Sequence, residues 1–502
     1  MEENILKLEK DFDESRDPIK GERRILNKLA SFENDISTYL SPWYKLSTTG
    51  NLAYPSQGLL ETPFDYLPYN SYSMLPQELI LRTLRLRYYF LELFNHPYRI
   101  HYLNQTNKQL FKAPPKIDCK AFDYAFNNGL SLSIGDIGAG VIGAEHERIS
   151  RKRRYAQGPF VKLGRQARMV FNGSESPDVW NSVAAVSTMA ISHCLTNISR
   201  NGVLSDIKRQ SDFAKEVYKW LDNFSEQLLK GRSDKKYILN LWKRNIMGTV
   251  EANPKSALQR ARKLFDVGVR AFRIYSPEPG TGPVDSVKII RKEFGDDVEI
   301  WTGNLVSVEQ AIKAQEAGAD GIVIGVGGGG RCITGVRSGS VVDWPELLWK
   351  LRGEINIPVI VHGGASDHTA VTLLLGASGI GVSRIVSGGT IESPGGALFY
   401  ADGNGRLFKP YGGEASARTK YLDGKMYPFG IPSFVEGEVT KAEMSYVKHA
   451  LPTLTYNLHL LTEDAILALV FRGVETIYDL HTINPSPLKQ NTSFGDFQKK
   501  TH

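Results

Sequence analysis

The sequence predicts a (β/α)8 barrel preceded by a mainly helical N-terminal region. Three units of amphipathic helix, glycine and short apolar strand recur at residues 257–276, 308–327 and 368–384. Their strands are apolar on both faces, which is typical of a parallel sheet covered on both sides. Glycine-rich or polar clusters follow almost every strand, and a barrel collects such loops into one site. The alternative, an open doubly wound sheet, needs such loops mainly at its switch point.

Residues 1–125 form the first predicted region, and they carry no functional motif. Glu78–Phe94 has a broad apolar stripe of helical period, so we expect a helix whose arginines, Arg82, Arg85 and Arg87, face water. The region either mediates oligomerisation or shields the barrel, and the sequence leaves both roles open.

The barrel is predicted over residues 126–480, followed by a polar C-terminal tail over residues 481–502. In each recurring unit a glycine (Gly268, Gly318 or Gly376) ends the helix, because glycine takes a positive φ without a Cβ clash. These glycines are 50 and 58 residues apart, which leaves room for two β/α units each. Further strands are predicted at 247–250, 298–302 and 358–361.

Composition indicates a globular protein of a reducing compartment, and we expect the cytoplasm. Three scattered cysteines (Cys119, Cys194 and Cys332) exclude a disulfide framework. The N-terminus lacks the apolar core of a signal peptide, and the apolar run Ala465–Phe471 has 7 residues where a bilayer needs ~18, so no membrane partner is expected. The net charge of +7 favours anionic substrates without establishing a nucleic-acid partner.

Basic residues are concentrated in one stretch, residues 145–168, which holds eight lysines or arginines. Two interpretations stay open at this point. The stretch is either a solvated helix or loop, or a surface for a phosphate-rich partner.

The stretch with the clearest chemistry is Gly327–Gly330, four consecutive glycines after an apolar strand. Bare backbone N–H groups there suit a phosphate or an oxyanion. Cys332 follows directly, and backbone dipoles or Arg331 would lower its pKa and expose a thiolate nucleophile. The alternative is a flexible turn followed by a buried structural cysteine.

Two further glycine pairs, Gly363–Gly364 and Gly388–Gly389, follow later strands. Loops after the late strands of a barrel commonly bind phosphate. In the alternative interpretation, Ser366 and Asp367 after the first pair cap the next helix.

From roughly residue 200 to 480 the chain resembles the IMP dehydrogenase/GMP reductase family. The resemblance runs in order through six motifs: GNLVS (Gly303–Ser307), GVGGGGRCIT (Gly325–Thr334), PVIVHGG (Pro358–Gly364), GTIESPG (Gly389–Gly395), FYADGNGRLFKPYGGEAS (Phe399–Ser416) and VEGEV (Val435–Val439). It implies a (β/α)8 barrel that acts on C2 of a purine nucleotide with NAD or NADP. It also implies a homotetramer and a monovalent cation, K⁺, near the Cys332 loop.

The resemblance implies a role for each matched residue. Cys332 is the nucleophile that adds to C2, and Thr334 positions water or ammonia. Tyr275 and Asn304 lie on the cofactor side. The substrate nucleotide is held by a larger set: Gly327, Gly329, Gly330, Gly363, Gly364, Arg384, Gly388, Gly389, Tyr411, Gly413 and Ser416.

Several positions depart from the family pattern. His362 stands where the family has the aspartate that binds the ribose diol, and Tyr275 replaces an aspartate on the cofactor side. Ala417 falls where the reductases have a catalytic glutamate. These departures keep the thiol and much of the glycine framework but change the ribose, cofactor and base-activating positions.

We therefore carry three interpretations forward. The first is an oxidoreductase acting at C2 of a purine nucleotide through Cys332. The second, motivated by Tyr275, His362 and Ala417, is a catalytically silent or regulatory homologue that binds a nucleotide or a protein through the retained loops. The third is a flavin-dependent barrel that uses its phosphate loops for FMN.

About 46 residues separate Asn201 from Met247, too few for the paired regulatory modules of dehydrogenases. The direction of reaction stays open.

Overall fold

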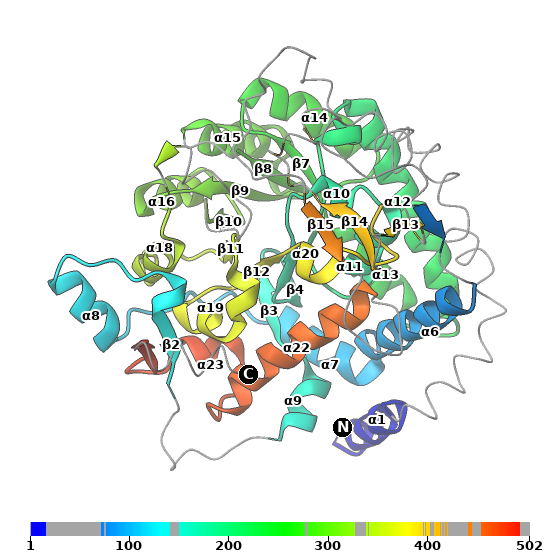
Figure 1. Ribbon diagram of the computed structural model, residues 1–502, viewed down its shortest axis with the longest axis horizontal. Helices are drawn as coiled ribbons and strands as arrows, with labels where there is room; N and C mark the ends of the chain where they lie inside the picture. The colour runs from blue at the N-terminus through cyan, green and yellow to red at the C-terminus, as the bar shows by residue number, and fades with distance from the viewer. Residues whose placement is uncertain are drawn as a thin grey trace.

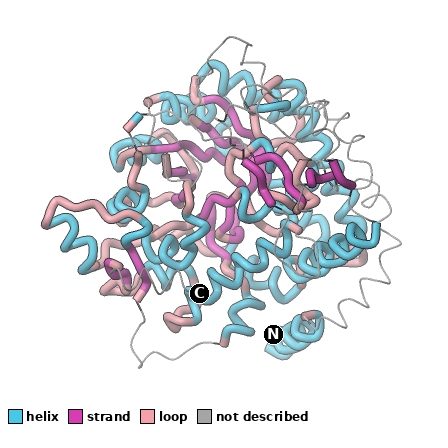
Figure 2. The backbone as a smooth tube through the Cα atoms, viewed as in Figure 1, coloured by secondary structure: helices cyan, strands magenta, loops and turns pink. Residues whose placement is uncertain are grey.

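Eight parallel strands form a ring in the order β5-β12-β11-β10-β9-β8-β7-β6, and helices surround them (Figures 1 and 2). The ring closes between β5 and β6, where the backbone N–H of Gly173 donates to the Leu195 carbonyl at 2.9 Å. The predicted barrel is confirmed, and the open sheet is excluded. The strands are β5 (Phe171–Gly173), β6 (Thr196–Ile198), β7 (Ile246–Glu251), β8 (Ala271–Tyr275), β9 (Glu299–Leu305), β10 (Gly321–Ile324), β11 (Val359–Val361) and β12 (Gly379–Val382).

This is a computed structural model. It describes residues 2–16, 72–74, 77–140, 150–276, 280–326, 338–339, 341–394, 396, 398–401, 406–411, 413, 416, 419, 440–443 and 453–491. No helix in these segments is long and apolar enough to cross a bilayer.

Three of the helices around the barrel, α14, α16 and α19, lie in the predicted recurring units. Gly268, Gly318 and Gly376 follow α14, α16 and α19 with φ of 103°, 95° and 117°, so the predicted helix-ending role of glycine is confirmed. The outer helices are α10 (Pro177–Trp180), α11 (Val183–Ile191), α12 (Ile207–Leu228), α13 (Lys235–Arg244), α14 (Pro254–Asp266), α15 (Gly282–Phe294), α16 (Val308–Glu316), α18 (Trp344–Lys350), α19 (Thr369–Leu375), α20 (Arg384–Ser387), α22 (Leu454–Val470) and α23 (Ile477–His481).

A β-hairpin closes the end of the barrel at which the strands begin. It is built from β3 (Phe160–Leu163) and β4 (Gln166–Met169). Its Leu163 joins one interior apolar layer with side chains from six barrel positions: Leu195, Met247, Ala271, Trp301, Val323 and Ile360. Arg168 of β4 forms a buried bidentate pair with Glu299, with N–O distances of 2.6 and 3.0 Å. The hairpin therefore fixes the floor, and any site must lie at the opposite end.

The N-terminal region is helical, as predicted, and its helices pack on the outer layer. Arg87 of α6 is buried, with its Nη2 donating to Thr188 Oγ1 at 3.1 Å and its Nε 3.5 Å from Glu392. The prediction that this arginine faces water is wrong, because α6 packs against the barrel helices and meets a buried carboxylate. The elements are α1 (Glu2–Ser15), β1 (Tyr72–Met74), α6 (Gln77–Phe94), α7 (Pro97–Asn107) and α8 (Lys120–Asn127).

Two smaller sheets complete the described structure. In one, β1 pairs with β13 (Leu398–Ala401), which continues into β14 (Leu407–Tyr411) and β15 (Thr440–Glu443). In the other, β16 (Leu488–Gln490) pairs antiparallel with β2 (Ile137–Ala139). Residues just beyond position 480 thus pack beside the segment in which the barrel region was predicted to begin. The helix α9 (Arg151–Gln157) lies in the basic stretch.

Candidate functional site at the carboxyl end of the barrel

The structure brings the described members of the predicted site to one end of the barrel. Tyr275 is the last residue of β8, and Asn304 lies near the end of β9. Gly363–Gly364 follow β11 directly, and Gly388–Gly389 follow α20 just beyond β12. Because the strands are parallel, these segments share the face on which barrel enzymes carry their chemistry.

The strand β10, which precedes Cys332 in the sequence, ends at the same end of the barrel. The predicted residues of the Cys332 loop, Gly327, Gly329, Gly330, Cys332 and Thr334, lie outside the described residues, as do the carbonyls that would hold a potassium ion. The end of β10 packs against the residue that follows β11. The N–H of His362 donates to the Ile324 carbonyl at 2.9 Å, and a Cβ on Gly325 would lie 2.4 Å from the His362 oxygen. The loop therefore starts directly beside His362.

The first glycine pair has a backbone that only glycine adopts readily. Gly363 and Gly364 have φ of 80° and 82°, and the Gly363 carbonyl accepts a hydrogen bond from Trp344 Nε1 at 3.0 Å. The alternative role of Ser366 and Asp367 as helix caps is wrong, since His368 is the N-cap of α19 and no side-chain hydrogen bond caps the helix. Gly363 and Gly364 thus form a left-handed turn that the hydrogen bond from Trp344 holds in place.

The segment Tyr411, Gly413 and Ser416 reaches the same end of the barrel. The Tyr411 hydroxyl lies 3.1 Å from Ser383 Oγ, immediately after β12. Ser416 is buried, and its hydroxyl donates to the Gly413 carbonyl at 2.8 Å. This contact places Tyr411 beside α20, of which Arg384 is the first residue.

A buried polar network crosses the barrel above its apolar floor. Arg273 Nε donates to Glu175 Oε1 at 2.9 Å, and Arg273 Nη2 donates to Asn304 Oδ1 at 2.9 Å. Asn197 Nδ2 donates to Glu175 Oε1 at 3.0 Å, while His362 Nδ1 lies 3.5 Å from Glu175 Oε2. The Glu175 carboxylate thus contacts side chains from β6, from β8 and from the residue that follows β11.

Glu175 and Arg273 were not among the predicted site residues. Arg273 had a signal in the sequence, because it is the one charged residue in the strand AFRIY, which was expected to be covered on both faces. Glu175 had only a weak signal, since it follows a three-residue strand that the periodicity did not assign. Only the folded barrel places the two charges side by side.

Burial keeps His362 uncharged at neutral pH. Burial lowers the pKa of His362 to about 4; the nearby Glu175 raises it and Arg273 lowers it further. Its buried Nε2 has no hydrogen-bond partner within the described segments, and neither do Asn197 Oδ1 and Thr249 Oγ1. Buried polar atoms of this kind are normally satisfied, so these three atoms suit water or a polar ligand.

A buried lysine, Lys409, supports the turn after Gly388–Gly389. Lys409 of β14 donates from Nζ to the carbonyls of Thr390 at 2.7 Å, Ser393 at 3.1 Å and Gly396 at 2.6 Å. Burial lowers the pKa of Lys409 well below its usual range. Glu392, in the same turn, accepts from the N–H of Leu454 at the start of α22 and faces Arg87. The N-terminal helix α6 therefore helps to hold this turn.

The residues predicted on the cofactor side fit part of a nicotinamide cofactor. Tyr275 offers an aromatic ring, and the half-buried Asn304 offers an amide, so a planar carboxamide ring suits them. A ribose diol finds no free carboxylate in this network, because Glu175 is already bonded to Arg273 and Asn197 and faces His362. Within the described segments, no cluster of three His, Cys, Asp or Glu side chains is arranged to hold a metal ion.

Comparisons with known proteins agree with this architecture. The model of the IMP dehydrogenase / GMP reductase domain matches residues 182–482. Inosine-5'-monophosphate dehydrogenase of Nitrosopumilus maritimus is 33% identical over 181 residues, 34% of this chain and 37% of that protein. The Helicobacter pylori (strain ATCC 700392 / 26695) enzyme of the same name is 32% identical over 198 residues, 36% of this chain and 40% of its own. Inosine-5'-monophosphate dehydrogenase 1 of Arabidopsis thaliana is 30% identical over 187 residues, 36% of each chain.

The chain thus spans about two fifths or less of the length of these relatives. The matched range begins after β5, so Glu175 and the floor hairpin lie outside it.

Proposed function

The chain belongs to the IMP dehydrogenase / GMP reductase family, and from this premise we propose that it is an oxidoreductase acting at C2 of a purine nucleotide. The observation that carries the proposal is the family match over residues 182–482. The gathering of the glycine turns at one end of the barrel supports it. We propose NAD or NADP as the cofactor, a homotetramer as the assembly and the cytoplasm as the location.

In the proposed mechanism Cys332 is the nucleophile. Its thiolate adds to C2, forming a C–S bond and placing the extra electron pair on the purine ring. Bound nicotinamide supplies the acceptor or the donor for the hydride at C2. Thr334 positions water, which then breaks the C–S bond to leave a C2 carbonyl and the free thiol. In the reductive direction, the Cys332 thiolate adds to C2 of a 2-aminopurine nucleotide, and the C2–N bond breaks as ammonia, positioned by Thr334, leaves. Hydride delivered to C2 then breaks the C–S bond and releases the thiolate.

The remaining residues hold the nucleotide in place for that attack. Backbone N–H groups of Gly363–Gly364 and Gly388–Gly389 bind the phosphate. Tyr411 contributes its hydroxyl beside Ser383. His362 is neutral and therefore gives the sugar one hydrogen bond rather than the two that a carboxylate accepts.

A second candidate function is a nucleotide-binding homologue without turnover. It is favoured by the buried network, in which the Glu175 carboxylate is already engaged by Arg273 and Asn197. Such a protein keeps the phosphate turns but lacks a free acidic partner for a ribose diol.

The deciding experiment uses a 2-chloropurine nucleotide and peptide mass spectrometry. We expect chloride to leave and a purine adduct to form on Cys332, and Cys332→Ser to abolish it. Cys119 and Cys194 are internal controls, because both are buried and burial raises the pKa of each thiol.

Reduced-nicotinamide absorbance, with IMP plus NAD and with GMP plus NADPH, then separates the two functions. Adduct formation with turnover supports the enzyme. Protection of Cys332 by nucleotide without turnover supports the binding homologue, and labelling only at other residues rejects both roles of the thiol.

A further inference from the structure

A cavity of about 560 Å³ lies at the floor end of the barrel, opposite the candidate site. Three segments that are far apart in sequence line it: residues 102–112 after and within α7, residues 153–162 of α9 and β3, and residues 475–481 of α23. Its volume is in the usual range for small-molecule sites. One wall comes from the N-terminal region, to which the sequence assigned no function.

Positive charge predominates in the lining. It contains four basic side chains, Lys112, Arg153, Arg154 and Lys162, and two acidic ones, Glu475 and Asp479. Both acids are engaged: Glu475 lies 3.7 Å from Arg154, and Asp479 accepts from Thr476 Oγ1 at 2.7 Å to cap α23.

Among the described residues, three of these cations have no carboxylate within ion-pair distance, and one of them, Lys162, instead donates from Nζ to the Asn107 carbonyl at 2.9 Å. Most described members of the basic stretch are paired: Arg151 with Glu463, Lys152 with Asp13, Arg165 with Asp320 and Arg168 with Glu299. Arg153 has no carboxylate within ion-pair distance among the described residues, and the same is true of Lys112. An anion in the cavity would therefore meet Lys112 and Arg153, whose charges no described carboxylate neutralises.

Aromatic side chains lie beside these cations. Lys112 Nζ sits 4.5 Å from the centre of the Tyr478 ring, and Tyr102, Phe111 and Phe160 also line the cavity. Ring faces of this kind stack on planar heterocycles, and the neighbouring cations suit phosphate oxygens.

We propose that this cavity binds a nucleotide, with Lys112 and Arg153 holding the phosphates and Tyr478 packing on the base. The floor hairpin connects the cavity to the barrel, because Phe160, Val161 and Lys162 line the cavity while the next residue, Leu163, packs inside the ring. This site is independent of the reaction proposed for the opposite end.

The test is calorimetric titration of the full chain with ATP and with inorganic tripolyphosphate. We expect Lys112→Glu/Arg153→Glu to weaken ATP binding at least about tenfold, a change of about 1.4 kcal/mol. We expect tripolyphosphate to bind more weakly than ATP, because it lacks the base. Equal affinity for ATP and tripolyphosphate would show that Tyr478 and the other rings do not contact the base.

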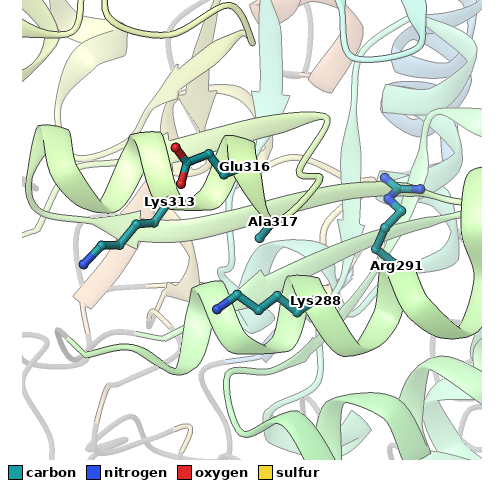
Figure 3. A pocket seen from close by; sticks show the side chains of 5 residues that line it. All are labelled: Lys288, Arg291, Lys313, Glu316 and Ala317. Carbon is teal, nitrogen blue, oxygen red and sulfur yellow. The ribbon is translucent and has the colours of Figure 1, made fainter.

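The matched control changes the same charge in another groove. Lys288 and Lys313 extend to the same side from α15 and α16 beside an open groove of about 330 Å³ (Figure 3). Arg291 there is already bonded to the Gly318 carbonyl and Asp320, so we propose no site. Lys288→Glu/Lys313→Glu should leave ATP binding within about twofold of the original.

Four results would overturn the proposal: no ATP binding by the unmodified chain, equal affinity for ATP and tripolyphosphate, an equal loss in both double variants, or no loss in either. Adduct formation on Cys332, measured in the same proteins, reports the opposite end separately. The failure of one site is therefore distinguishable from the failure of the other.

Discussion

Replacement of Glu175 by glutamine should destabilise the barrel strongly. Glu175 and Arg273 have side chains only 2% and 1% exposed, and their N–O distance is 2.9 Å. Glu175→Gln keeps the shape but leaves the Arg273 guanidinium without its carboxylate. Breaking a buried pair from one side costs about 3–5 kcal/mol, because an uncompensated charge stays buried. The free energy of unfolding, measured by urea titration at pH 7, should fall by that amount.

The double variant Glu175→Gln/Arg273→Met separates pairing from general damage. With both charges removed, we expect a loss smaller than the sum of the two single losses by about 2 kcal/mol or more. The control is Glu354→Gln, whose partner Lys116 is 72% exposed, and it should cost no more than about 1 kcal/mol. Additive single losses, or a Glu175→Gln variant as stable as the control, would refute the buried network as described.

Two further predictions concern the same interior. Burial lowers the pKa of His193 and His481 to about 3 and that of His362 to about 4. Below about pH 6.5 these three histidines become protonated in the unfolded chain but stay neutral in the folded chain. Each should therefore lower the free energy of unfolding by about 2 kcal/mol at pH 5 relative to pH 7. The urea midpoint should fall between pH 7 and pH 5, and an unchanged midpoint would contradict this. Gly381→Ala should cost about 1–3 kcal/mol and weaken nucleotide binding, because its Cβ would lie 2.2 Å from His362 Cδ2. The matched Gly280→Ala has open space, so thermal unfolding should separate the two variants, and equal midpoints would count against the described position of His362.

Much of the barrel could be predicted from local patterns. The predicted strands at 247–250, 298–302 and 358–361 correspond to β7, β9 and β11. Apolar runs and helix-ending glycines report local burial and backbone conformation, which neighbouring residues largely determine. The first strand of the ring and the floor hairpin escaped prediction, because β5 is three residues long and β3 and β4 are four residues each.

By itself, the sequence determined the fold class, the family and the places where glycine turns follow strands. Each of these depends on residue order over short distances. Tertiary structure alone decided that Arg87 is buried, that Glu175 meets Arg273 and His362, and that residues 102–112, 153–162 and 475–481 enclose one cavity. The physical reason is that charge pairing and desolvation depend on distance in space, and closure of the ring sets those distances between residues up to several hundred positions apart.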